Sequence, residues 1–198
     1  MQALILIDIQ HDFVDGSLGS PEALTIIPKV NALIQTFRDK PLFFTVDAHP
    51  IDHSSFAATH NLPDFTIKEG SVKWPVHCVK GSHGAEIYRE IVVPFDAKIC
   101  EKAQDPEIDA YSAFFDEKGR PSSSLDSLLK EFDIKNIAFC GIAGDFCVDK
   151  TLLDALKLGY KVEVYSDAVA FIDPTKREET LKKWENHGAV IKKVPEIQ

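Results

Sequence analysis

Residues 136–147 read NIAFCGIAGDFC, and this stretch decides the fold class. Its apolar run at 136–141 predicts a buried strand, and the turn after it opens a helix predicted at 146–158. In that helix Val148 and Leu152 recur at helical spacing, so one face is apolar. A strand that passes through a short turn into an amphipathic helix is the repeating unit of an α/β sheet.

The same alternation recurs along the whole chain. Near-continuous Val/Ile/Leu/Phe runs are typical of parallel strands that are covered on both faces. The predicted strands are 3–8, 42–47, 98–101, 136–141, 161–165 and 189–192, and the predicted helices are 24–38, 123 or 124 to 132, 146–158 and 175–187. We therefore expect one α/β domain over residues 1–198, a doubly wound, mostly parallel six-stranded sheet with helices on both faces.

One connection is too long for a plain crossover. Residues 48–96 hold five of the seven histidines. Loops of this length in a compact domain are usually functional.

The composition excludes several classes of function. The chain has 198 residues and a formal net charge of −9, and it has no block of lysine and arginine, so nucleic acid and anionic membranes are not expected as partners. Its apolar runs are shorter than the roughly 20 residues that cross a bilayer, and we expect the first of them, which stops at Asp8, to be a strand and not a signal peptide. With four cysteines and no disulfide pattern, a cytoplasmic protein is expected. Glycine-rich dinucleotide and P-loop motifs are absent, which argues against an organic cofactor.

Four chemically active residues follow or end predicted strands: Asp8, Asp47, Lys102 and, after the turn, Cys147. Ligands of open α/β sheets bind beyond the carboxyl ends of the strands. We therefore expect these side chains to meet.

Cys147 falls in the first turn of its predicted helix, where free N–H groups and the helix dipole favour the reactive thiolate. The alternative is a buried structural cysteine. Asp8 is a candidate general base if burial raises its pKa, or else a loop or helix cap. Lys102 would hold that carboxylate and favour the thiolate, although most lysines are solvated surface charges.

Asp47, His49 and His77 offer an O/N/N ligand set that suits zinc or iron. The alternative is that His49 only forms a loop hydrogen bond. Three further histidines compete as donors, namely His53, His60 and His83. Phe13 and Trp74 are either core residues or platforms that stack on a flat ring.

Several separated motifs agree on a resemblance to the isochorismatase-like hydrolases, and among them to the nicotinamidases. They are LIDIQHDF (6–13), DAHPIDHSSF (47–56), KWPVHC (73–78), EKAQDP (101–106), DAYSAF (109–114) and GIAGDFC (141–147). The resemblance covers nearly the full chain.

The resemblance implies an amidohydrolase that converts nicotinamide to nicotinate and ammonia, and that also cleaves pyrazinamide. It implies a catalytic triad of Asp8, Lys102 and Cys147. It also implies an oxyanion hole from the N–H groups of Ala143 and Cys147, with a cis peptide bond between Ile142 and Ala143.

For the cofactor, the resemblance implies one divalent metal on Asp47, His49 and His77. Zinc is expected first, with iron or manganese as alternatives. The metal would bind the pyridine nitrogen while Phe13 and Trp74 sandwich the ring. A homo-oligomer is implied as well.

Two residues depart from the family pattern: His11 stands where asparagine is usual, and Gly144 where threonine is common. We expect Gly144 to loosen the turn and His11 to alter loop hydrogen bonding. The rival functions are another amidohydrolase of the same scaffold, with a carbamoyl or ureido substrate, and a non-catalytic metal-binding protein. An isochorismatase proper needs no cysteine, so Cys147 argues against it.

Overall fold

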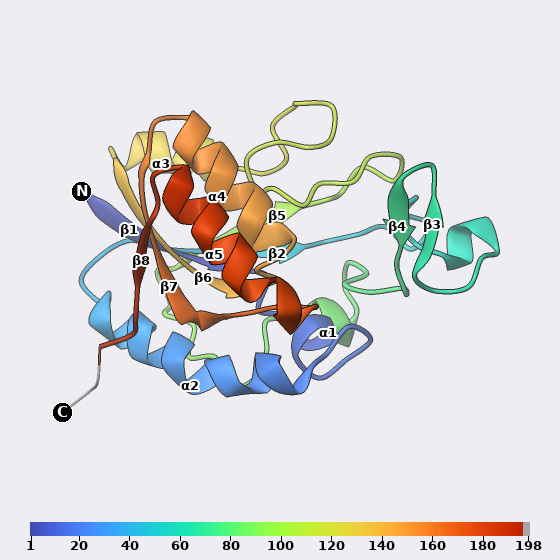
Figure 1. Cartoon of the computed structure of the whole chain (residues 1–198), viewed down its shortest axis with the longest axis horizontal. Coiled ribbons are helices and arrows are strands. Elements are labelled where there is room, and N and C mark those ends of the chain that lie inside the picture. Colours follow the sequence, from blue (N-terminus) through green and yellow to red (C-terminus); the bar gives the residue numbers. More distant parts are fainter. Residues whose placement is uncertain (196–198) are drawn as a thin grey trace.

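The computed structural model describes residues 1–195, and its centre is one six-stranded sheet (Figure 1). The strands are β1 (Gln2–Ile7), β2 (Leu42–Asp47), β5 (Lys98–Lys102), β6 (Asn136–Ile142), β7 (Lys161–Ala170) and β8 (Val190–Lys192). Every pair in this sheet is parallel. The predicted α/β sheet of six strands is confirmed, and it is all-parallel rather than mostly parallel.

The strand order is β5-β2-β1-β6-β7-β8. The chain builds outward from β1 in one direction and then restarts on its other side with β6. The strands that follow β1 are added on one side of the sheet and those that follow β6 on the other. The strand order therefore reverses between β1 and β6, and their carboxyl ends form the switch point at which such sheets bind ligands. Asp8 follows β1 and the nucleophile turn (residues 141–147) follows β6.

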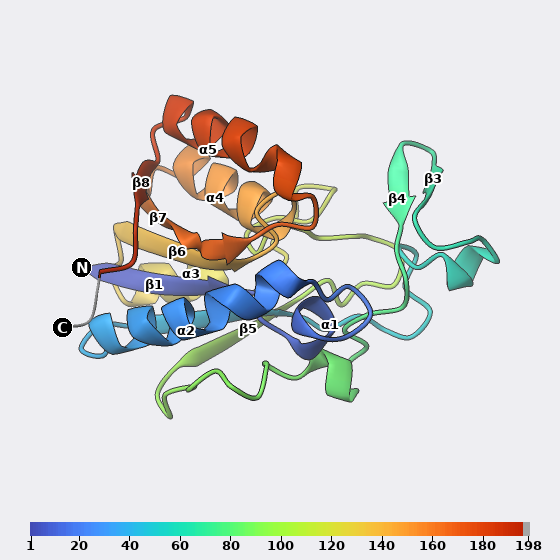
Figure 2. The same ribbon diagram turned by 60° about the horizontal axis from the view of Figure 1, so that its bottom comes forward.

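Helices cover both faces of the sheet (Figure 2). Helix α2 (Pro21–Thr36) packs on one face, and α3 (Leu125–Glu131), α4 (Cys147–Lys157) and α5 (Arg177–Asn186) lie on the other. Helix α2 begins three residues earlier than predicted, because Ser20 caps it through a 3.2 Å bond from Ala23 N–H and Pro21 occupies its first turn. No helix among residues 1–195 is both long and apolar enough to cross a membrane.

The long connection after β2 contains an unpredicted hairpin, β3 (Thr66–Lys68) with β4 (Ser71–Lys73). Both figures show it projecting beyond the ends of the parallel strands, away from the amino terminus. The single-turn helix α1 (His11–Val14) was not predicted either. Three-residue strands and a four-residue helix are too short to show a periodicity in sequence.

Strand β7 runs five residues beyond its predicted end. Its pairing with β6 shifts register between Phe139 and Gly141, and the ladder then continues to Ala170. Polar Ser166 and Asp167 interrupt the apolar run, which is why the sequence predicted an early end. The extension carries the chain to Phe171 and Ile172, beside the nucleophile turn.

Candidate active site

Cys147 is the first residue of α4, and its side chain is buried at the switch point. The ammonium nitrogen of Lys102 lies 3.6 Å from its sulfur. A carboxylate oxygen of Asp8 lies within 4.8 Å of the same sulfur. The three residues predicted to meet are therefore brought together from the ends of β1, β5 and β6.

Asp8 is fully buried and has a left-handed backbone conformation, with φ of 48°. Its Oδ1 accepts a 2.6 Å hydrogen bond from the Thr45 hydroxyl, and its Oδ2 lies 3.0 Å from Lys102 Nζ. Apart from that ion pair, Oδ2 has no hydrogen-bond partner among residues 1–195. One oxygen is thus held by Thr45, while the other is paired with Lys102 alone.

Lys102 has a second carboxylate partner that the sequence did not reveal. Its Nζ donates to Asp47 Oδ1 at 2.5 Å and to the Ala110 carbonyl at 3.0 Å. The side chain is buried, although a solvated surface lysine was the alternative. One ammonium group therefore joins the catalytic and the metal-ligating candidates.

Burial controls the charges in this cluster. It raises the pKa of Asp8, as predicted, although the charge of Lys102 opposes the shift. Burial tends to lower the pKa of Lys102, but Asp47 and Asp8 outweigh it and hold that pKa well above 10.5. Burial tends to raise the pKa of Asp47, but the charge of Lys102, the neighbouring His49 and His77, and the hydrogen bond from Lys102 together outweigh it, so the pKa is lowered.

The helix amino terminus was expected to favour the thiolate of Cys147, but it does not by itself make the residue a thiolate in the free site. Burial, together with the charges of Asp8 and Asp47, raises the pKa of Cys147 well above 9.0, although Lys102 opposes the shift. One ammonium group already faces two carboxylates, so a further negative charge on sulfur is unfavourable. The resting residue is a thiol beside a base.

Asp47, His49 and His77 form a second buried group, in which one ligand atom of each lies within 4.8 Å of the others. Asp47 Oδ2 lies 3.8 Å from His49 Nε2. His77 Nδ1 lies 2.8 Å from the Pro75 carbonyl, which can only accept, so Nε2 is left with a free lone pair. Burial lowers the pKa of His49 to about 3, which keeps that ring neutral too.

These donors fit a divalent metal such as zinc, because all three are unprotonated and converge. The competing histidines have other partners. His53 Nδ1 pairs with Ser55 Oγ at 2.7 Å, His60 Nε2 with the Ser54 carbonyl at 2.8 Å, and His83 Nδ1 with Glu86 at 2.9 Å. The geometry thus distinguishes among histidines that the sequence left open.

The side chain of Gln10 fixes the backbone of Asp47, a role that was not predicted from the sequence. Its side-chain amide donates to the Asp47 carbonyl and accepts from the Asp47 N–H, both at 2.8 Å. It also donates to the Ala85 carbonyl at 2.9 Å. Its position two residues after Asp8 was the only signal in the sequence, since a buried glutamine cannot be recognised locally.

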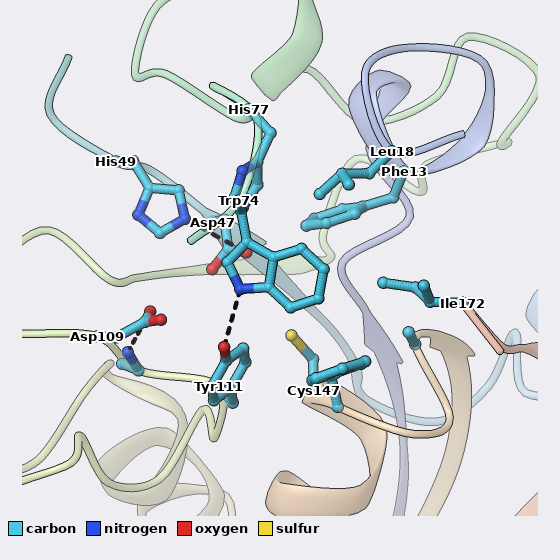
Figure 3. Close-up of a pocket in the computed structure, with 13 residues that line it drawn as sticks. Phe13, Leu18, Asp47, His49, Trp74, His77, Asp109, Tyr111, Cys147 and Ile172 are labelled. Carbon is cyan, nitrogen blue, oxygen red and sulfur yellow. Dashed lines mark hydrogen bonds and ion pairs between the residues drawn. The ribbon is translucent and has the colours of Figure 1, made fainter. Parts of the chain in front are cut away.

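A pocket of roughly 390 Å³, counting its open mouth, is lined by Cys147 and by Asp47, His49 and His77 (Figure 3). Phe13 and Trp74 are both buried in its wall, so the predicted aromatic residues do reach the site. Trp74 Nε1 donates to the Tyr111 hydroxyl at 2.9 Å. The lining residues to which the sequence assigned no role are Leu18, Asp109, Ala110, Tyr111, Phe146 and Ile172.

The nucleophile turn contains the expected cis peptide bond between Ile142 and Ala143. Among residues 1–195, the N–H groups of Ala143 and Cys147 donate to no backbone or side-chain acceptor. Both residues line the pocket. The N–H group of Ala143 in the turn and that of Cys147 at the start of α4 are thus free to receive an oxygen atom.

Neither departure from the family pattern disturbs the site. Gly144 was expected to loosen the turn, but its N–H donates to the Ala170 carbonyl at 2.8 Å and the Phe171 ring fills the space beside it. His11 pairs with Asp15 at 3.0 Å and packs on His83 with ring centroids 4.0 Å apart. The Phe171 ring thus fills the space that a side chain at position 144 would take.

Comparison with known proteins agrees with this geometry. The family model described as the isochorismatase domain matches residues 2–195. The chain is 38% identical to a nicotinamidase of Escherichia coli (strain K12) over 173 residues, which is 84% of this chain and 81% of that protein.

Two solved structures are also similar. One is the nicotinamidase/pyrazinamidase of Acinetobacter baumanii, with a TM-score of 0.89 and 36% identity over 98% of this chain and 96% of that one. The other is the pyrazinamidase of Pyrococcus horikoshii in complex with zinc, with a TM-score of 0.83 and 36% identity over 97% of this chain and 98% of that one. The fold, the switch-point site and the match over nearly the full chain lead to one conclusion: the protein belongs to the isochorismatase family.

Proposed function

We propose that this protein is a nicotinamidase, which hydrolyses nicotinamide to nicotinate and ammonia and also accepts pyrazinamide. One observation carries the proposal: Cys147, which lies beside Lys102 and Asp8, lines the same narrow, aromatic-walled pocket as the Asp/His/His group. The similarity to proteins named as nicotinamidases supports it.

In the first half of the reaction, Asp8 Oδ2 takes the proton of the Cys147 thiol as sulfur attacks the carboxamide carbon. Burial suits Asp8 to this role, because a carboxylate with a raised pKa is a stronger base. Lys102 keeps the carboxylate oriented and offsets the charge that develops on sulfur.

The N–H groups of Ala143 and Cys147 receive the oxyanion of the tetrahedral intermediate; one such donor contributes about 3–4 kcal/mol to catalysis. The intermediate collapses when the C–N bond breaks, and Asp8 passes its proton to the departing ammonia. This leaves a thioester on Cys147. Asp8 then deprotonates a water molecule, which attacks the thioester and releases nicotinate and the thiol.

Asp47, His49 and His77 would hold one divalent metal, most simply zinc. When bound, it would supply a Lewis-acidic contact for the nitrogen of the pyridine ring. Phe13 and Trp74 would enclose the ring between apolar walls. The metal and the two aromatic residues would orient the substrate, so that its amide carbon lies next to the Cys147 sulfur.

The test is turnover by the metal-replete protein. We expect nicotinate and ammonia in equal amounts from nicotinamide, and a kcat/KM for benzamide at least about 100-fold lower, because benzamide lacks the ring nitrogen. The absence of nicotinate, or faster cleavage of an N-carbamoyl amino acid, would contradict the proposal and favour the carbamoyl or ureido alternative.

The metal assignment makes a separate prediction. His77→Ala should weaken zinc binding by more than about 100-fold, since losing a direct ligand costs more than losing the outer partner of one. The matched control is His60→Ala, which removes a histidine from the same long connection but outside the ligand group. Chelator competition measures both affinities. Equal zinc affinities in the two variants would show that His77 is not a zinc ligand and that zinc binds elsewhere.

A further inference from the structure

Gly144 in the nucleophile turn has no side chain because a neighbouring ring occupies the space. A β-carbon built there would lie 2.4 Å from Cζ of Phe171 and 2.5 and 2.7 Å from its two Cε atoms. Gly144 is not among the glycines with positive φ, so its backbone would suit any residue. The requirement for glycine is therefore steric and not conformational.

The Phe171 ring is itself held in place from three sides. Phe171 is buried, and its N–H donates to Glu22 Oε2 at 2.7 Å. The guanidinium of Arg177 lies over the ring, 4.4 Å from its centroid, and pairs with the other oxygen of Glu22. Trp184 packs at a centroid distance of 6.3 Å. The ring cannot yield without disturbing α2 and α5.

The turn is also fastened to the residues around Phe171 through the backbone. Gly144 N–H donates to the Ala170 carbonyl at 2.8 Å. The Asp145 carboxylate accepts the N–H groups of Ile172 and Asp173 at 3.0 and 2.9 Å. The turn that presents Cys147 is therefore hydrogen-bonded to the end of β7 and the residues after it. The Phe171 ring supplies the side-chain packing in this contact.

We propose that Phe171 is a positioning residue for the nucleophile turn, and that Gly144 and Phe171 act as a matched steric pair. The Cys147 sulfur has to stay near Lys102 and Asp8, and a displacement of about 1 Å costs about 100-fold in rate. A ring that is clamped between α2 and α5 supplies the rigidity that such a site needs. The link to amide hydrolysis rests on the proposed function, but the placement of the sulfur does not.

The experiment measures alkylation of Cys147 by iodoacetamide, followed by peptide mass spectrometry, which needs no assumption about the substrate. Gly144→Ala should slow alkylation about 100-fold, because the new methyl group forces the turn away from the ring and moves the sulfur away from Asp8, the base that removes its proton. Phe171→Ala should slow it about 10-fold. The double variant should recover to within about threefold of Phe171→Ala, since the methyl group then has room.

The control for lost packing is Phe37→Ala, which removes another buried ring, one that packs edge-on against Tyr165. It should lower Tm and leave the alkylation rate unchanged. With nicotinamide, Gly144→Ala should lower kcat more than it raises KM, because Phe13, Trp74 and the Asp/His/His group come from other elements. If neither the native protein nor any variant hydrolyses nicotinamide, but the alkylation rates differ as expected, the proposed function is contradicted and the matched steric pair is not.

Normal alkylation in Gly144→Ala, or a double variant as slow as Gly144→Ala, would overturn the matched pair. If Gly144→Ala does not fold, Phe171→Ala is compared directly with Phe37→Ala. Equal alkylation rates in those two variants would show that Phe171 is core packing only.

Discussion

Replacing Cys147 by alanine should lower kcat/KM for nicotinamide by at least about 10⁴-fold, the scale at which a removed nucleophile acts. No other sulfur can take over, since Cys78, Cys100 and Cys140 are absent from the pocket lining. Ammonia release measures the loss, and mass spectrometry should find no thioester on the variant.

The matched control is Cys140→Ala, which removes a buried sulfur from β6 and leaves the pocket unchanged. Asp8→Asn should lose activity to a similar extent, because the thiol of Cys147 then has no base. The two losses should not add, since both residues act in one step. Turnover that survives in Cys147→Ala would refute the thioester mechanism.

Lys102→Met should lower the free energy of unfolding of the metal-free protein by roughly 3–5 kcal/mol near neutral pH. Methionine approximates the apolar stem of the lysine side chain but leaves the carboxylates of Asp8 and Asp47 buried without their cation. Removing one partner of a buried ion pair has costs of this size. Denaturant unfolding at several pH values measures the change.

The sign of the pH dependence is specific. In the native protein the pKa of Asp47 is lowered, so its ionisation stabilises the fold above the unfolded pKa, and this is lost as pH falls through the folded value. Without Lys102 the pKa of each buried acid should lie above its unfolded value, so stability is kept in acid and lost as pH rises. The difference between native and variant should therefore be widest near pH 7 and shrink toward pH 4.

Lys98→Met is the control for losing a lysine from β5, because that residue is exposed and makes no ion pair among residues 1–195. Its stability change should stay within about 0.5 kcal/mol. An equal effect of Lys102→Met at pH 4.5 and pH 7 would mean that the two carboxylates are not the cause.

Most of the sheet could be predicted because its strands are buried on both faces and read as continuous apolar runs. The hairpin of β3 and β4 and the end of β7 could not, since the first is too short for a pattern and the second continues through Ser166 and Asp167. The cap at Ser20 was visible as Ser-Pro, but the apolar stripe that marks α2 begins later. Boundaries depend on such local bonds more than on periodicity.

The sequence by itself determined the α/β class, the residues placed at strand ends and the motif spacing shared with the isochorismatase family. Only the tertiary structure decided which histidines converge, that Lys102 is shared by Asp8 and Asp47, that Cys147 rests as a thiol, and that Phe171 excludes a side chain at Gly144. The physical reason is that periodicity and turn chemistry are properties of neighbours in the chain. Desolvation, charge pairing and steric exclusion arise between groups that only the folded sheet brings within a few ångströms.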